Sequence, residues 1–173
     1  MRYVEFMIEN EDNPIIYLDM DGVLADFDKG YHKLFGTKPK NQPSRFDDNV
    51  KQLIGTDFFA TLDKLPDADK VVQLALEYGN GKYSICSSPF TNDHDNSARY
   101  KTEWIREHLS PQPEHIVITG KKDTYAKGKN VLIDDRPDNI QKWIDRGGIG
   151  IWYDAYQHSI DKVSDELSKA FNK

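Results

Sequence analysis

Short apolar runs that alternate with amphipathic stretches constrain the fold of this chain more than any other feature of its sequence. Runs of strand length lie at 15–18, 83–86, 115–118, 131–133 and 149–153. Stretches with a helical spacing of apolar residues lie at 66–79, 97–109, 137–146 and 159–171. Strands that alternate with helices of this length predict right-handed crossovers and a parallel sheet covered by helices on both faces. We therefore expect a three-layer, doubly wound α/β fold with a Rossmann-type core.

The interval 28–65 breaks this alternation, because it separates the first strand from the first crossover helix by more than a crossover needs. It contains KGYHKLFG, the polar link TKPKNQPSRFDD and the pair Phe58-Phe59. This pattern predicts a small, mostly helical insertion, so we expect residues 1–27 and 66–173 to form the core and 28–65 to form a cap. The opening hexapeptide YVEFMI (3–8) is compatible with an extra edge strand or with a docked extension.

The composition indicates a globular protein and argues against several classes of function. The chain is 38% hydrophobic and carries a formal charge of −6, which disfavours a protein that grips nucleic acid along its backbone. The single cysteine, Cys86, excludes a disulfide within the chain and suits an intracellular setting. The sequence has neither a signal-peptide pattern nor an apolar stretch of membrane-spanning length. We expect a cytoplasmic protein without nucleic-acid or membrane partners, and a homodimer is compatible with the sequence.

The first apolar run continues into the sequence IIYLDMDGVLADF at residues 15–27. On an extended strand Asp19 and Asp21 would share one face but lie about 7 Å apart, so strand geometry alone would not make their carboxylates converge. Gly22 permits a tight turn that would bring the two carboxylates together, and converging carboxylates require a cation. The alternative is an ordinary Asp-Gly turn in which both aspartates are solvated.

Polar segments follow each of the first four predicted strands. They are Asp19-Met20-Asp21-Gly22, Ser87-Ser88-Pro89, Thr119-Gly120-Lys121-Lys122 and Asp134-Asp135-Arg136-Pro137. In doubly wound sheets, ligands bind outside the carboxyl ends of the strands, where such segments meet. Acids, hydroxyls and lysines gathered there are what metal-assisted phosphoryl transfer requires.

With these four segments in order, residues 15–139 resemble the haloacid dehalogenase (HAD) superfamily of phosphatases. The stretches DMDGVLADF, FFATLDKLPDA, ICSSP and LIDDRPD are more similar to the 5′(3′)-deoxyribonucleotidases than to sugar-phosphate phosphatases. The resemblance implies a HAD-like core and Mg²⁺-dependent hydrolysis of nucleoside monophosphates, which are small-molecule substrates. Two alternatives stay open: a phosphatase for another small ester such as a sugar phosphate, and a catalytically silent nucleotide-binding protein.

The resemblance also implies roles for the aspartates. Asp19 would be the nucleophile that forms an aspartyl-phosphate, and Asp21 would act first as acid and then as base. Asp19, Asp134 and the backbone carbonyl of Asp21 would hold Mg²⁺. Asp135 would bind the metal through water or orient its ligands, although it could instead cap the helix 137–146.

A phosphate cradle is implied in the same way. Ser87 would donate its hydroxyl to the phosphate, together with the backbone amides of Ser88 and of Met20 to Gly22. The family places a lysine after the third strand, and Lys122 fits best, although GKKDTYAKGK is longer than the family's spacing. The alternatives are Lys121, Lys127, Lys129 and, more weakly, Lys101 on the preceding helix.

An apolar pocket for the nucleoside is expected next to the first motif. Phe27 follows that motif so closely that it should face the substrate, and the family has a phenylalanine there that lines the nucleoside pocket. Further candidates for the wall are Phe46, Phe58, Phe59 and Phe90. Phe58 and Phe59 could instead fill the core of the insertion.

The histidines and tryptophans give no sign of a second site. The histidines lack metal-ligand spacing and are interpreted as surface or structural residues: His32, His94, His108, His115 and His158. Trp104, Trp143 and Trp152 are expected to serve packing.

Overall fold

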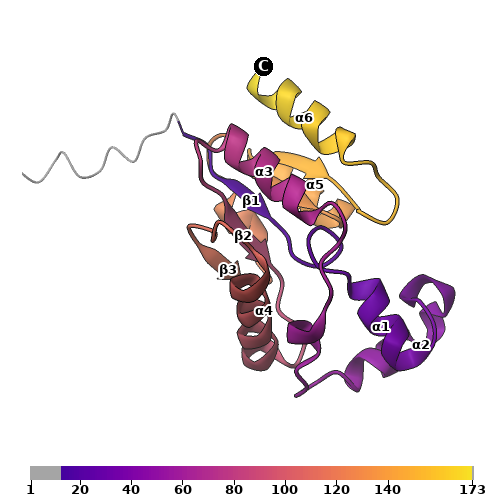
Figure 1. Ribbon diagram of the computed structural model, residues 1–173. Coiled ribbons are helices and arrows are strands. Elements are labelled where there is room, and N and C mark those ends of the chain that lie inside the picture. Colours follow the sequence, from indigo (N-terminus) through magenta and orange to yellow (C-terminus); the bar gives the residue numbers. More distant parts are fainter. Residues whose placement is uncertain (1–12, 173) are drawn as a thin grey trace, which may run out of the picture.

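The computed structural model describes residues 13–172, and within them five parallel strands form one sheet in the order β3-β2-β1-β4-β5 (Figure 1). The strands are β1 (Ile16–Leu18), β2 (Ser84–Ser87), β3 (Ile116–Ile118), β4 (Val131–Asp134) and β5 (Ile149–Trp152). Each strand coincides with a predicted run, although β2 and β4 extend one residue beyond theirs. The hexapeptide at 3–8 lies outside the described residues.

Side chains of the central strand alternate between two cores, as the period of a strand requires. Tyr17 pairs with Ser84 of β2 and with Leu132 of β4. Ile16 and Leu18 join the larger apolar cluster on one face of the sheet, whereas Tyr17 joins the smaller cluster on the other. Strands buried on both faces explain why the runs are continuously apolar.

Helices cover both faces of the sheet. The larger cluster includes side chains from α3 (Ala68–Tyr78), α4 (His94–His108) and α6 (Asp161–Phe171). The smaller cluster includes side chains from α5 (Pro137–Asp145) and the 3₁₀ turn η3 (Lys122–Tyr125). Trp104 and Trp143 are fully buried on opposite sides, as their predicted packing roles require. The prediction of a three-layer α/β fold is confirmed.

The elements between β1 and α3 are all helices or helical turns, and α1 and α2 lie away from the helices that cover the sheet (Figure 1). The elements are α1 (Phe27–Phe35), η1 (Pro39–Asn41), α2 (Pro43–Lys51) and η2 (Phe58–Thr61). The side chain of Asp26 caps α1 by accepting a hydrogen bond from the amide of Lys29, and Gly36 ends the helix at a φ of 69°. We call residues 27–61 the inserted segment. The exact division into a core and a cap at 28 and 65 stays a prediction.

The two connections to the inserted segment run side by side. The amide of Asp26 donates to the carbonyl of Asp63 at 2.8 Å, and the amide of Leu65 donates to the carbonyl of Leu24 at 2.8 Å. Gly30 makes close packing possible, because a Cβ at this position would collide with Leu62. The segment therefore enters and leaves the sheet through one narrow, paired connection.

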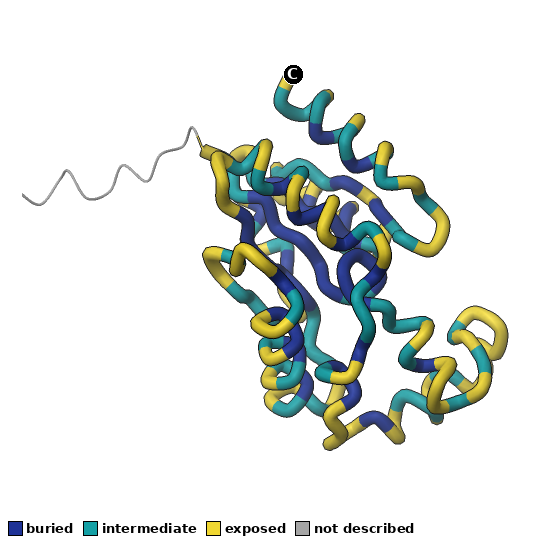
Figure 2. The backbone as a smooth tube through the Cα atoms, viewed as in Figure 1, coloured by how far each residue is buried: buried dark blue, intermediate teal, exposed yellow. Residues whose placement is uncertain are grey.

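Burial divides the chain in the same way. The central strands are buried, whereas the stretch that carries α1 and α2 is mostly half-buried or exposed (Figure 2). Among residues 13–172, no helix has both the length and the apolar character that a membrane crossing requires.

Candidate active site

The turn after β1 is formed as the sequence predicts. The carbonyl of Met20 accepts hydrogen bonds from the amides of Leu24 and Ala25 at 2.8 and 2.9 Å, which curls the chain back on itself. Gly22 has a φ of 75°, and a Cβ there would collide with the carboxylate of Asp135. This position therefore requires glycine for both conformation and space. Asp19 and Asp21 consequently face one cavity.

Lys122 is buried between two aspartates at the floor of the cavity. Its Nζ lies 2.9 Å from Asp19 Oδ1 and 2.6 Å from Asp134 Oδ2. Burial disfavours the lysine's charge, but the two carboxylates outweigh burial and raise the pKa of Lys122. Burial also works against the charge of Asp19, yet Lys122 and Lys101 together lower the pKa of that carboxyl. Asp19 is therefore held as a carboxylate.

Of the candidate lysines at 121–129, Lys122 is the one that lines the cavity. It is also the one that the sequence favoured. The short turn η3 carries it under the carboxyl end of the sheet, where it meets residues from β1 and β4. Its role as a phosphate ligand stays a prediction.

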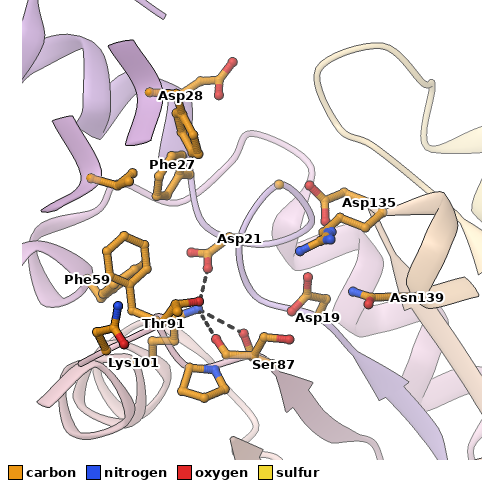
Figure 3. Close-up of a pocket in the computed structure, with 18 of the residues that line it drawn as sticks. Asp19, Asp21, Phe27, Asp28, Phe59, Ser87, Thr91, Lys101, Asp135 and Asn139 are labelled. Atoms are coloured by element: carbon orange, nitrogen blue, oxygen red, sulfur yellow. Dashed lines mark hydrogen bonds and ion pairs between the residues drawn. The ribbon is translucent and has the colours of Figure 1, made fainter. Parts of the chain in front are cut away.

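Lys101 supplies a second buried cation from α4. Its Nζ contacts Asp21 Oδ2 at 2.5 Å and Ser87 Oγ at 3.3 Å, and it donates to the carbonyl of Ser88 at 2.8 Å. Figure 3 shows Lys101 beside Asp21 and Ser87, with Phe59 next to them. Sequence reasoning ranked this lysine too low, because a lysine inside a helix gives no local signal of a site.

The two aspartates of the first motif differ in their electrostatics. Burial raises the pKa of Asp21 despite the opposing effect of Lys101, whereas the pKa of Asp19 is lowered. One buried oxygen of Asp21, Oδ1, has no hydrogen-bond partner among the described residues. Asp19 therefore favours the ionised form that a nucleophile needs, and Asp21 holds its proton more tightly, as an acid must.

Three carboxylates form a group that could hold a metal ion. Oxygens of Asp19, Asp134 and Asp135 lie within 4.8 Å of one another. Asp134 is fully buried, and it accepts hydrogen bonds from the amide of Arg136 at 2.9 Å and from the side chain of Asn139. Burial and the neighbouring carboxylates raise the pKa of Asp135 to about 9. Three carboxyl groups around the one ammonium of Lys122 offer oxygen donors and an excess of acidic groups, which suits a hard divalent cation.

The side chain of Asp21 is not part of this carboxylate group. Its predicted metal contact runs through the backbone carbonyl, and that contact stays a prediction. The predicted phosphate residues Ser87, Ser88 and Gly22 all line the cavity next to the carboxylates. Ser87 is fully buried at the end of β2.

The cavity has a volume of 630 Å³ and continues from the carboxylates to the inserted segment. Of the predicted aromatic wall, four members line it: Phe27, Phe46, Phe59 and Phe90. Phe58 does not line it. Its ring packs edge-to-face against Phe27 and Phe59, with centroids 5.5 and 5.3 Å apart, so Phe58 belongs to the core of the inserted segment, as the alternative interpretation held.

Several residues of the cavity carried no prediction. Asp28, Asn139 and Tyr156 line it from three different elements or loops. Figure 3 shows Asn139 and Asp135 on the side of Asp19, and Phe27 and Phe59 on the other side of Asp21. The motif LIDDRPDN places Asn139 one helical turn after the aspartates, so its sequence position was a usable signal. Tyr156 lies far from every motif.

The fold and these strand-end residues define a protein of the HAD class. A HAD family enzyme from Bacteroides thetaiotaomicron, solved with magnesium and inorganic phosphate, has a TM-score of 0.51 to this chain. The match has 14% sequence identity and covers 86% of this chain and 98% of that one. At this identity the similarity supports the fold alone.

Sequence comparison identifies the family. The model described as "5′ nucleotidase, deoxy (Pyrimidine), cytosolic type C protein" matches residues 13–165, and the chain belongs to this family. The predicted resemblance to HAD-type deoxyribonucleotidases is confirmed.

Two mammalian relatives illustrate the similarity. The mitochondrial 5′(3′)-deoxyribonucleotidase of Mus musculus is 29% identical over 149 residues, which cover 71% of this chain and 64% of the relative. The cytosolic-type 5′(3′)-deoxyribonucleotidase of Homo sapiens is 29% identical over 143 residues, which cover 70% of each chain. The chain thus spans less than two thirds of the length of the mitochondrial relative.

Proposed function

We propose that this protein is a Mg²⁺-dependent phosphatase that hydrolyses deoxyribonucleoside monophosphates to nucleoside and phosphate through an aspartyl-phosphate. The observation that carries the proposal is the pairing of Asp19, ionised beside Lys122, with Asp21, whose pKa is raised, in one cavity. The names of the relatives support the choice of substrate.

The reaction follows from these groups in two steps. The carboxylate of Asp19 attacks phosphorus and the bond from phosphorus to the ester oxygen breaks, while Asp21 gives its proton to that oxygen. The carboxylate of Asp21 then takes a proton from water, and the resulting hydroxide attacks the phosphorus of phospho-Asp19. This step releases phosphate and restores Asp19. Lys122, Lys101 and Ser87 would donate hydrogen bonds to the phosphoryl oxygens in both steps.

The carboxylate group fits Mg²⁺ because it offers oxygen ligands and an excess of negative charge. Asp19, Asp134 and Asp135 would hold the ion, with the carbonyl of Asp21 as a further ligand. Asn139 and the amide of Arg136 would orient Asp134. Bound Mg²⁺ would neutralise charge on the phosphoryl oxygens and the carboxylates.

The inserted segment would act as a cap that selects the leaving group. Phe27, Phe46 and Phe59 would form an apolar wall beside the sugar and the base. Such a wall accepts deoxyribose but leaves a ribose 2′-hydroxyl desolvated without a partner, which costs roughly 1–3 kcal/mol. This cost corresponds to about five- to 150-fold in kcat/KM.

The test is a panel of phosphate esters assayed with Mg²⁺ and with EDTA. We expect dUMP or dTMP to be hydrolysed with higher kcat/KM than UMP and deoxyribose 5-phosphate, and we expect activity to disappear in EDTA and return with Mg²⁺. Equal rates for dUMP and UMP, or a faster sugar phosphate, would overturn the deoxynucleotide assignment. Tight nucleotide binding without turnover of any ester would favour the silent binding protein. Activity that survives thorough chelation would exclude the metal site.

A further inference from the structure

The end of β5 and the loop that follows it, residues 152–158, contact three separate parts of the site. The indole N–H of Trp152 donates to the carbonyl of Asp135 at 3.0 Å. The amide of Ala155 donates to the carbonyl of Gly22 at 3.0 Å. Tyr156 reaches the inserted segment and also lines the cavity. One loop therefore touches the acidic group, the catalytic turn and the start of α1.

The Tyr156 hydroxyl makes two hydrogen bonds to the first turn of α1. It donates to Asp26 Oδ1 at 2.8 Å and accepts from the amide of Asp28 at 3.0 Å. The same Asp26 oxygen accepts from the amide of Lys29. The first amides of a helix have no acceptor within it. Here the amide of Asp28 donates to Tyr156, and the amide of Lys29 donates to Asp26, the residue that Tyr156 holds.

Phe27 lies between the two residues that Tyr156 holds. Its ring packs edge-to-face on Phe58 and lies near Phe59. Tyr156 holds the side chain of Asp26 before it and the backbone amide of Asp28 after it. Phe27 and Asp28 lie side by side in Figure 3, on the far side of Asp21 from Asp19. Moving the first turn of α1 would therefore move the aromatic wall relative to the catalytic turn.

The loop is itself braced from within. The amide of Tyr156 donates to Asp154 Oδ1 at 2.9 Å, and the amide of Asp154 donates to His158 Nδ1 at 3.0 Å. The ring of His158 packs edge-to-face on Trp152, with centroids 4.7 Å apart. These bonds give Tyr156 a defined position, although its side chain is 36% exposed.

We propose that Tyr156 is a positioning residue that fixes the first turn of α1, and with it Phe27, at the distance from Asp19 and Asp21 that a nucleoside monophosphate spans. This inference rests on the proposed function for its substrate. The hydroxyl, rather than the ring, performs this role, because both contacts to α1 run through the oxygen.

The test compares Tyr156→Phe with the wild type on two substrates. dUMP must reach the aromatic wall, whereas 4-nitrophenyl phosphate serves as a small ester that reports on the catalytic centre. Loss of the hydroxyl removes hydrogen bonds of about 0.5–1.5 kcal/mol net, so we expect the ratio of kcat/KM for dUMP to that for 4-nitrophenyl phosphate to fall about two- to twelvefold. The change should appear in the KM for dUMP rather than in kcat.

Tyr83→Phe is the matched control. It also removes one tyrosine hydroxyl, which donates to the carbonyl of Pro111 at 2.6 Å away from the cavity. We expect this variant to be less stable but to keep the wild-type substrate ratio. A substrate ratio that does not change in Tyr156→Phe, or that changes equally in Tyr83→Phe, overturns the inference.

Hydrogen–deuterium exchange separates this inference from the proposed function. In Tyr156→Phe the amides of residues 27–30 should exchange faster than in the wild type, and those of α4 should not change. If the wild type fails to hydrolyse dUMP, the proposed function fails, and the exchange data alone then decide whether Tyr156 positions α1. Exchange at 27–30 that matches the wild type rejects the positioning role whatever the substrate.

Discussion

The floor and the wall of the cavity are built in opposite ways. The floor, formed at the ends of β1, β2 and β4, consists of buried charged side chains held in short ion pairs, with Asp134 fully enclosed. The wall, formed by the inserted segment, consists of aromatic rings in contact, and α2 contributes no buried residue at all. Strand register fixes the positions of the floor residues, whereas the wall joins the larger apolar cluster through Phe58 and Phe59. Under the proposed function, the reaction type would depend on the strand ends and the choice of substrate on the inserted segment.

Removing the nucleophile should break the floor's function most severely. In Asp19→Asn the amide occupies the same volume but cannot attack phosphorus, so we expect turnover to fall by ~10³-fold or more. Steady-state assays of a purified variant measure this, and circular dichroism should show an unchanged fold. Substantial residual activity in a preparation free of contaminating phosphatase would contradict the covalent role of Asp19.

A change at Asp134 should weaken the floor without abolishing it. Asp134→Asn removes one carboxylate from the acidic group and alters the partner of Lys122. We expect the Mg²⁺ concentration for half-maximal activity to rise about ten- to hundredfold. Titration of activity with Mg²⁺ gives this value, and Asp138→Asn, which alters an exposed ion pair with Arg136, is the control. Identical Mg²⁺ requirements in both variants would remove Asp134 from the metal site.

Two neighbouring phenylalanines can test the wall. Phe27 lines the cavity and Phe58 lies behind it. Phe27→Ala should raise the KM for dUMP. It should also reduce the ratio of kcat/KM for dUMP to that for UMP, which we expect to be about fivefold or larger in the wild type. Phe58→Ala should instead lower the free energy of unfolding by about 3–5 kcal/mol, because its ring is buried. Kinetics and chemical denaturation on both variants separate these effects. If Phe58→Ala changed the KM and Phe27→Ala changed only the stability, the assignment of Phe27 to the wall and Phe58 to the core would be wrong.

The pKa of Asp135 predicts a smaller effect on stability. In the metal-free protein this pKa is about 9, above its unfolded value of 3.8, so the folded state binds the proton more tightly. The resulting stabilisation is complete below the unfolded pKa and is lost as the pH rises toward 9. At the proposed metal site Mg²⁺ would replace the proton, so the difference in Tm between Mg²⁺ and EDTA samples should widen from pH 6 to pH 9, by about 2–4 °C per kcal/mol. A difference that stays constant across this range would contradict the raised pKa.

The sequence predicted the floor well because the apolar runs locate the carboxyl ends of the strands. Once those ends were located, Asp19, Ser87 and Asp134 had to meet at one edge of the sheet. The wall was harder to predict. Phe58 and Phe59 are adjacent in a 3₁₀ turn, and only the three-dimensional structure decides which ring faces the cavity.

Contacts between distant parts of the chain were the hardest to anticipate. Lys101 meets Asp21 across 80 residues, and Tyr156 meets Asp26 across 130. Neither residue lies in a motif. A side chain in a helix or a surface loop can serve a site without any local pattern, so the sequence gives no signal for it. Trp152 and His158, interpreted as packing and structural residues, prove to support the loop that carries Tyr156.

The paired connection at Leu24–Asp26 and Asp63–Leu65 has a consequence for how this protein can be altered. The chain leaves and returns at neighbouring points, so the ends of the inserted segment stay together whatever its length. Doubling the length of a loop costs only about 0.6 kcal/mol of closure entropy. The inserted segment could therefore be exchanged as a unit if its core contacts are kept. A shorter or longer one could be spliced between residues 26 and 63 to redirect the proposed catalyst to other esters. It would have to supply apolar residues where Phe58, Phe59 and Leu62 pack in the core, and a glycine where Gly30 meets Leu62.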